Sequence, residues 1–232
     1  MLATLFSSSL LGIDAVPVAV EVDIAPGLPQ FATVGLPDGA VKESKDRVKA
    51  GLKNAGYDFP ARRITVNLAP ADLKKEGAAF DLPISVGILA ATGVITGRKL
   101  KEYLIIGELS LDGSIKPVRG ALPVAVTARR EGYAGVILPR ENVREAAVVE
   151  GIDVIGVGEL AEVVGFLNGE REIAPFRVDV HELFRQQGEY GDDFSEVKGQ
   201  EHAKRALEVA ASGSHNILML YSIYLNEREV ER

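Results

Sequence analysis

The sequence contains no cysteine, only three histidines and no long uninterrupted hydrophobic run. Without cysteine, the chain can form no disulfide, thiol nucleophile or thiolate metal site. The histidines His181, His202 and His215 lack metal-ligand spacing, so we expect them on the surface and expect no metal centre. No segment reaches the roughly 18 apolar residues of a membrane span. The N-terminus also lacks the basic region of a signal peptide, so we expect a cytoplasmic protein with no membrane partner.

An excess of positive charge is also absent. The chain has 26 Lys and Arg against 33 Asp and Glu, which leaves a formal charge of −7. Such a molecule is no general binder of polyanions, and any contact with nucleic acid must come from a local patch. The 47% hydrophobic content over 232 residues is sufficient for a sizeable core.

The hydrophobic pattern predicts a mixed α+β or α/β fold. Its first part reads as strands at 3–11, 16–24, 31–34 and 64–68, with helices at 38–55 and 81–92. A hairpin of 103–111 and 114–116 turning at Asp112-Gly113 follows. Beyond it, helices 119–131, 141–149 and 159–167 alternate with strands 135–138 and 152–156. This alternation indicates βαβ units and therefore parallel strands in a mixed sheet.

Composition divides the chain into three parts. Residues 1–168 carry the regular pattern, and 169–197 have the polar and glycine-rich character of a linker. Residues 198–232 begin a second domain, with a predicted helix at 200–212 and an apolar strand at 216–221. One helix and one strand cannot bury a core by themselves.

Three motifs carry a resemblance to a known family. They are Val34-Gly35-Leu36-Pro37-Asp38, the stretch from Leu68 to Ile84, and Ile106-Gly107-Glu108-Leu109-Ser110-Leu111-Asp112-Gly113. Together they closely resemble the N-terminal region of Mg-chelatase-like AAA+ ATPases of the ComM/YifB type. The resemblance implies a Lon-protease-like domain of the ribosomal S5 domain 2 fold, followed by an ATPase module.

The stretch from Phe194 to Leu207 resembles the opening of that module, which implies that Val197, Gly199 and Gln200 lie beside the adenine. The family implies ATP and Mg²⁺ as cofactors of a full-length parent. It also implies the ATPase module and neighbouring subunits of a hexameric ring as partners, and DNA is kept as a further partner.

The chain departs from the family after Leu220. A phosphate loop needs glycines, a lysine and a Ser or Thr for Mg²⁺, whereas residues 221–232 contain neither glycine nor lysine. We therefore expect a polypeptide truncated before the Walker A motif that holds no cofactor and does not hydrolyse ATP. Tyr221, Tyr224 and Leu225 would then be exposed and favour association.

The resemblance to Lon also raises the question of peptidase chemistry by a Ser-Lys pair. It implies a serine position at Ala79 or near Leu82 and a lysine position at Leu122, and these side chains are aliphatic. The nearest substitutes are Ser85 and Lys116, so a surviving peptidase remains an alternative. The plain interpretation is a packed serine, a solvated lysine and no catalytic residue.

Other charged residues leave two interpretations each. Lys42, Lys45, Lys49 and Lys53 fall within an arc of roughly 80° on the predicted helix, and Arg62 and Arg63 follow. They form either a DNA-contacting surface or a solvated face diluted by Glu43 and Asp46. The segment with Asp72, Lys74, Lys75 and Glu76 is either a docking loop or a polar connection. Glu108 either points into a vestigial cleft or anchors a turn.

The leading hypothesis is a non-catalytic regulatory or substrate-guiding domain of a Mg-chelatase-like AAA+ ATPase linked to DNA processing or natural competence. The alternatives are the peptidase and a stand-alone DNA-binding module.

Overall fold

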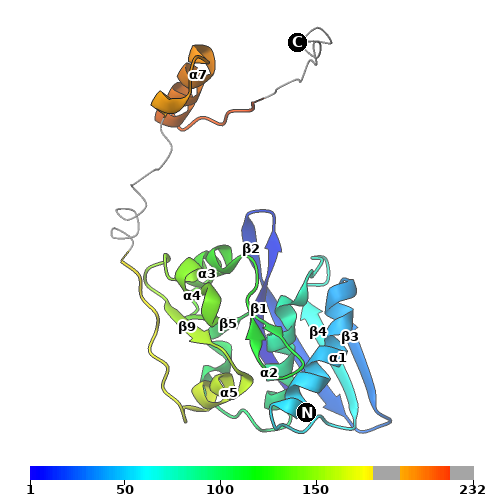
Figure 1. Cartoon of the computed structure of the whole chain (residues 1–232). Helices are drawn as coiled ribbons and strands as arrows, with labels where there is room; N and C mark the ends of the chain where they lie inside the picture. The colour runs from blue at the N-terminus through cyan, green and yellow to red at the C-terminus, as the bar shows by residue number, and fades with distance from the viewer. Residues whose placement is uncertain (180–193, 220–232) are drawn as a thin grey trace, which may run out of the picture. The chain divides into compact units, whose positions relative to one another are not determined.

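The computed structural model describes residues 1–179 and 194–219. The chain divides into two compact units, Met1–Val180 and His181–Arg232, which are described separately (Figure 1).

A seven-stranded mixed sheet forms the centre of the first unit. Its order is β3 (Gln30–Val34), β4 (Arg63–Ala69), β2 (Asp14–Ala25), β1 (Leu2–Leu11), β5 (Tyr103–Ile105), β8 (Gly135–Pro139) and β9 (Asp153–Val157). Strand β2 runs antiparallel to both of its neighbours, while the pairs β3–β4, β1–β5, β5–β8 and β8–β9 are parallel. The predicted mixed sheet with βαβ units is therefore confirmed.

The helices pack on the sheet through two hydrophobic clusters. The larger cluster joins α1 (Gly39–Asn54), α2 (Asp81–Ala91) and α5 (Leu160–Asn168) to one face, which includes Ile105 and Ile137. The smaller cluster joins α3 (Ala121–Arg130) and α4 (Val143–Ala146) to Leu104 and Val136. Because successive strand residues point to opposite faces, helices cover the β5–β8–β9 region on both sides.

Helix boundaries follow the local sequence closely at α1 and α2. The Asp38 side chain caps α1 by accepting a hydrogen bond from the Val41 N–H at 2.8 Å. A 3₁₀ turn (Ala78–Phe80) leads directly into α2, whose residues are buried almost all round, as its apolar composition predicts.

The predicted hairpin of 103–111 and 114–116 is wrong in two respects. The first arm is divided into β5 and β6 (Glu108–Leu109), and only β6 pairs with β7 (Ile115–Lys116). The division occurs at Gly107, whose N–H donates to Ala79 and whose carbonyl accepts from Leu82, so this residue bonds the start of α2 instead of a strand. The turn also spans Leu111–Gly113, because Ser110 bonds Ser114 across it.

Two other predicted elements are corrected or lie partly outside the described residues. The helix predicted at 141–149 is only a 3₁₀ turn (Arg140–Asn142) followed by α4, and a 3₁₀ turn at Arg98–Lys101 was not predicted. In the second unit, a 3₁₀ turn (Phe194–Glu196) precedes α7 (Glu201–Ser212). Residues 216–219 form no strand, and 220–221 lie outside the described residues.

The segment after α5 continues along the first unit. Ile173 packs against the larger hydrophobic cluster and Val178 against the smaller one. The Phe176 N–H donates to the Val154 carbonyl at 2.8 Å, and Arg171 lies 3.0 Å from Glu162 of α5. The predicted linker of 169–197 is thus divided between the two units.

Candidate functional site

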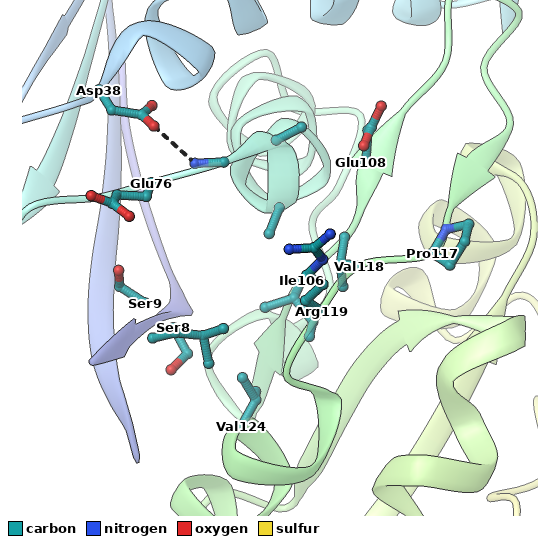
Figure 2. Close-up of a pocket in the computed structure, with 14 residues that line it drawn as sticks. Ser8, Ser9, Asp38, Glu76, Ile106, Glu108, Pro117, Val118, Arg119 and Val124 are labelled. Atoms are coloured by element: carbon teal, nitrogen blue, oxygen red, sulfur yellow. Dashed lines mark hydrogen bonds between the residues drawn. The ribbon is translucent and has the colours of Figure 1, made fainter. Parts of the chain in front are cut away.

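A cavity of about 540 Å³ opens between β1, the loop before α2 and the segment after β7. Its lining comes from Ser8–Leu10, Glu76–Ala79, Ile106 with Glu108, and Pro117–Arg119, with Asp38 and Val124 completing it (Figure 2). We call this cavity the cleft. Its volume lies within the range of about 300–1,000 Å³ that is typical of ligand-binding pockets.

Hydrogen bonds to the backbone hold the walls of the cleft. The Asp38 carboxylate accepts from the N–H groups of Val41 at 2.8 Å and Gly77 at 3.1 Å, and so joins α1 to the loop before α2 (Figure 2). On the other side, Asn142 accepts from the Val118 N–H at 2.9 Å and donates to the Val118 carbonyl at 2.8 Å. The cleft is therefore preformed by bonds between segments that are distant in the sequence.

The serine hydroxyls of the cleft are already bonded to carbonyl groups. Ser8 donates to Val16 at 3.0 Å and Ser9 donates to Lys74 at 3.3 Å. Ala79 lines the cleft at the position where the resemblance to Lon implies a serine, and the lining contains neither lysine nor histidine. Among the residues that line the cleft, the serines therefore have no lysine or histidine to act as a base.

The two substitute residues do not line the cleft. Ser85 is fully buried inside α2, where its hydroxyl donates to the Asp81 carbonyl at 2.8 Å. Lys116 is exposed on β7 beside Pro117. The remaining implied positions also stay aliphatic, since Leu82 is buried in the core and Leu122 is half-exposed on α3.

The loop before α2 differs from the expected charged connection at one residue. Lys75 is fully buried, and its ammonium donates to the Pro70 carbonyl. Its backbone pairs with the segment before α1, accepting from Asp38 at 2.9 Å and donating to Leu36 at 3.2 Å, and this pairing carries the side chain into the interior. Burial lowers the pKa of Lys75. Its neighbours Lys74, Glu76 and Asp72 are exposed. Because Lys75 itself is buried, it cannot offer its charge to a partner on the surface of this loop.

An ion pair between the partly exposed Arg47 and the buried Asp81 is the feature that the sequence analysis missed. Arg47 of α1 donates from Nε to Asp81 Oδ2 at 2.6 Å and from Nη2 to Oδ1 at 3.1 Å. Asp81 Oδ2 also accepts from the Leu109 N–H of β6 at 3.4 Å. Burial raises the pKa of Asp81 to about 6, although Arg47 and the Leu109 N–H act in the opposite direction. An acidic residue at the start of a fully apolar helix was the signal available in the sequence.

Glu108 lies half-buried at the cleft on β6, opposite Lys116 of β7. The negative charge of Glu108 also helps to raise the pKa of Arg47. Glu108 therefore lies at the cleft, while the alternative role as the anchor of a turn stays a prediction.

The predicted basic surface is exposed as a whole. Its six members carry no ion pair among the residues that the structure describes: Lys42, Lys45, Lys49, Lys53, Arg62 and Arg63. Glu43 and Asp46 are exposed on the same helix.

The residues predicted to lie beside an adenine, Val197, Gly199 and Gln200, are exposed in the second unit, immediately before α7. His202 and His215 are also exposed, whereas His181, Tyr221, Tyr224 and Leu225 lie outside the described residues. Across residues 1–179 and 194–219, no group of His, Cys, Asp and Glu side chains is arranged to hold a metal ion. Over the same residues, no helix has the length and apolar character needed to cross a bilayer.

Comparison with known proteins identifies two family regions. The family model of subunit ChlI of Mg-chelatase matches residues 20–142, and a model of magnesium chelatase, subunit ChlI, matches residues 193–222. The chain is 41% identical over 221 residues to the competence protein ComM of Haemophilus influenzae, covering 94% of this chain and 43% of that protein. It is 40% identical over 220 residues to the YifB protein of Escherichia coli, covering 94% and 42%.

A more distant similarity extends to proteases. The chain is 29% identical over 135 residues to Lon protease 2 of Bacillus subtilis, covering 56% of this chain and 23% of that protein. The chain spans less than half the length of the ComM and YifB relatives. Because the first family model covers more than half of the 232 residues, the chain belongs to the Mg-chelatase subunit ChlI family, with ComM and YifB among its relatives.

Proposed function

We propose that the first unit is a non-catalytic regulatory or substrate-guiding domain of a Mg-chelatase-like AAA+ ATPase that works in DNA processing or competence. The observation that carries this proposal is the chemistry of the cleft. Its serine hydroxyls donate to backbone carbonyls, and Ala79 stands at the position where the similarity to Lon implies a nucleophile. In this proposal the domain binds or orients the substrate, and an ATPase module hydrolyses the ATP that drives the reaction.

The proposal extends to nucleotide chemistry in this chain. Residues 221–232 contain neither the glycines nor the lysine that a phosphate loop requires. Val197, Gly199 and Gln200 include neither the lysine nor the Ser or Thr hydroxyl that a phosphate loop uses for the triphosphate and Mg²⁺. ATP and Mg²⁺ are thus proposed as cofactors of a longer parent, together with its ATPase module and neighbouring subunits as partners.

The test is direct. The purified 232-residue chain is incubated with fluorescent casein and separately with ATP and Mg²⁺, while peptide release and phosphate release are measured. We expect neither activity above the buffer blank. Turnover that co-purifies with the chain and disappears in Ser85→Ala would instead establish the peptidase alternative, and phosphate release would contradict the nucleotide part of the proposal.

The basic surface supports one second candidate, a DNA-binding module. Its six cations are exposed and unpaired within the described residues, which is the arrangement that phosphate contacts require. The test is binding of single-stranded and forked DNA over a series of salt concentrations, with Lys45→Glu/Lys49→Glu as the variant and Lys101→Glu/Arg129→Glu, two exposed cations outside the basic surface, as the matched control. Loss of salt-dependent binding in the first variant alone supports this candidate, and absence of binding at low salt excludes it.

A further inference from the structure

We propose that the cleft binds an extended acidic peptide, which it holds beside strand β1 without cleaving it. This proposal names a ligand for the domain and so goes beyond its proposed guiding role. It rests on the proposed function in one respect, namely that the domain does not cleave the bound peptide. It rests on three observations, namely the free edge of β1, the anchored walls of the cleft and the unpaired charge of Arg119.

The first observation is the edge of β1. This strand pairs with β2 along its whole length, from Leu2 to Leu11, but on its other side it pairs with β5 only at Phe6. Beyond Phe6, the residues Ser8–Leu10 line the cleft instead of meeting another strand. An unpaired strand edge presents a row of N–H and C=O groups that a further extended chain can bond. The cleft therefore offers main-chain hydrogen bonds along one wall.

The second observation is that the space beside this edge is kept open. Asn142 holds the backbone of Val118 on the opposite wall through two hydrogen bonds of 2.9 and 2.8 Å. Asp38 and Ser9 anchor the loop before α2 at Gly77 and Lys74. Ile106, Ala79 and Val124 supply apolar lining between these walls. A peptide entering the cleft would thus meet walls that need no ordering on binding, which favours affinity.

The third observation is the charge balance of the lining, which contains three carboxylates and one guanidinium. The Asp38 carboxylate accepts two backbone N–H groups, and Glu76 pairs with Lys74 at 2.6 Å. The charge of Glu108 contributes to raising the pKa of Arg47, whose ion pair is with Asp81. Asp38 and Glu76 therefore already have donors of the chain itself.

Arg119 differs from these groups. It is exposed in the lining and makes no ion pair within the described residues. In Figure 2 its guanidinium lies among the lining residues, between Ser8 and Ser9 of β1 on one side and Glu108 on the other. A carboxylate carried by an extended peptide beside β1 would meet this guanidinium, and such charge-assisted pairs are the strong polar contacts of peptide recognition. Pairing with Arg119 thus favours a strand that carries a carboxylate at this position over one that carries a cation there.

The test uses the full chain and a short fluorescein-labelled peptide of alternating valine and threonine with aspartate at its centre. Two companion peptides carry lysine at the centre, or proline at alternate positions to remove N–H donors. We expect the aspartate peptide to bind, and the other two to bind at least about tenfold more weakly. Amide NMR shifts of Ser8–Leu10 should change with the aspartate peptide, since these residues line the cleft.

Two variants address the site. Arg119→Ala removes the charge from an exposed side chain and should weaken binding about 10- to 100-fold, while Ala79→Leu fills the cleft and should abolish binding. Arg129→Ala, which alters another exposed arginine, on α3 and outside the lining of the cleft, is the matched control and should bind as the parent does. Thermal unfolding of each variant verifies that it is folded. If Ala79→Leu does not fold, Arg119→Ala still decides the test.

Equal binding of all three peptides, or unchanged binding in Arg119→Ala, would overturn the inference. So would Arg119-dependent binding of a single-stranded oligonucleotide in place of the peptide. Cleavage of the bound peptide would contradict the proposed non-catalytic function while leaving peptide binding intact, so the two failures are distinguishable.

Discussion

At the scale of single residues, the environment of Asp81 is set by two opposing effects. The bidentate contact with Arg47 favours the ionised carboxylate and raises the pKa of the arginine. Removal of Asp81 from water disfavours the same ionised form, and burial outweighs the ion pair, so the pKa of Asp81 rises to about 6. This ion pair and the Leu109 N–H join α1, α2 and β6, and the contribution of Asp81 to stability depends on pH.

This shift predicts a specific pH dependence. The folded-state pKa of Asp81 lies above its ordinary value of 3.8, so the folded protein binds this proton more tightly than the unfolded chain. The associated stability is fully present below pH 3.8 and is lost as the pH rises through about 6. The difference corresponds to roughly 3 kcal/mol at about 1.4 kcal/mol per pKa unit.

The measurement is urea unfolding of the parent and of Asp81→Asn between acidic and neutral pH. The free energy of unfolding of the parent should fall relative to that of Asp81→Asn as the pH rises through this window. Asp46→Asn, which alters an exposed carboxylate of α1, is the control and should leave the pH profile of the parent unchanged. A parent whose stability relative to Asp81→Asn stays constant or increases with pH would contradict the assignment.

Single residues are also where sequence reasoning was least complete. Lys75 stands in a run of charged residues and carries no sequence signal that separates it from Lys74, yet only Lys75 is buried. The difference arises because its backbone pairs with residues 36 and 38 and because the Pro70 carbonyl accepts from its ammonium. Both partners are fixed by tertiary pairing, which a residue's type and neighbours do not encode.

At the scale of elements, the motif before α1 requires glycine at position 35, because the backbone there lies very close to strand β4. Gly35 has a φ of +95°, and a Cβ atom there would lie 2.0 Å from the Leu68 carbonyl oxygen at the end of β4. Any side chain would therefore be strained by its backbone conformation and would also displace β4. This is a physical reason for the glycine in Val34-Gly35-Leu36-Pro37-Asp38, one of the motifs that carry the family resemblance.

Gly35→Ala should accordingly lower the free energy of unfolding by about 3–5 kcal/mol. Gly56→Ala is the matched control, because Gly56 also has a positive φ, +87°, but has no atom within 4 Å of an added Cβ. That variant should cost only about 1 kcal/mol, from backbone strain alone. Equal unfolding midpoints for the two variants in urea would argue against the close approach of β3 and β4.

Elements with strong local signals were predicted well. The Asp38 cap and the apolar composition of 81–92 are properties of contiguous residues, and α1 and α2 form as expected. The prediction of a continuous strand at 103–111 was wrong, because the backbone of Gly107 forms hydrogen bonds with Ala79 and Leu82 and not with a neighbouring strand. That exchange depends on where the start of α2 lies in space.

At the scale of the whole molecule, the first unit holds both hydrophobic clusters and includes the segment after α5. Ile173 and Val178 add partly buried surface to the two clusters, and Phe176 bonds β9. These contacts predict that the segment after α5 contributes to the stability of the first unit.

A chain of residues 1–168 should be less stable than 1–180 by about 2 kcal/mol, from lost apolar burial and a lost hydrogen bond. For a domain of this size the unfolding midpoint should fall by about 4–8 °C, as measured by circular dichroism. A third chain, 1–180 carrying Ile173→Ser, should show part of this loss. Identical midpoints for 1–168 and 1–180 would mean that the segment contributes nothing to the unit.

The sequence by itself determined the alternation of helices and strands, the mixed sheet, the family resemblance and the aliphatic character of Ala79 and Leu122. These properties depend on residue type and spacing along the chain. Only the tertiary structure decided that Lys75 is buried, that Asp81 pairs with Arg47, and that an open edge of β1 faces Arg119 across a cleft. Each of these contacts joins residues that the fold brings together from distant parts of the sequence. The free energies of burial and of ion pairing depend on how close such residues lie in space.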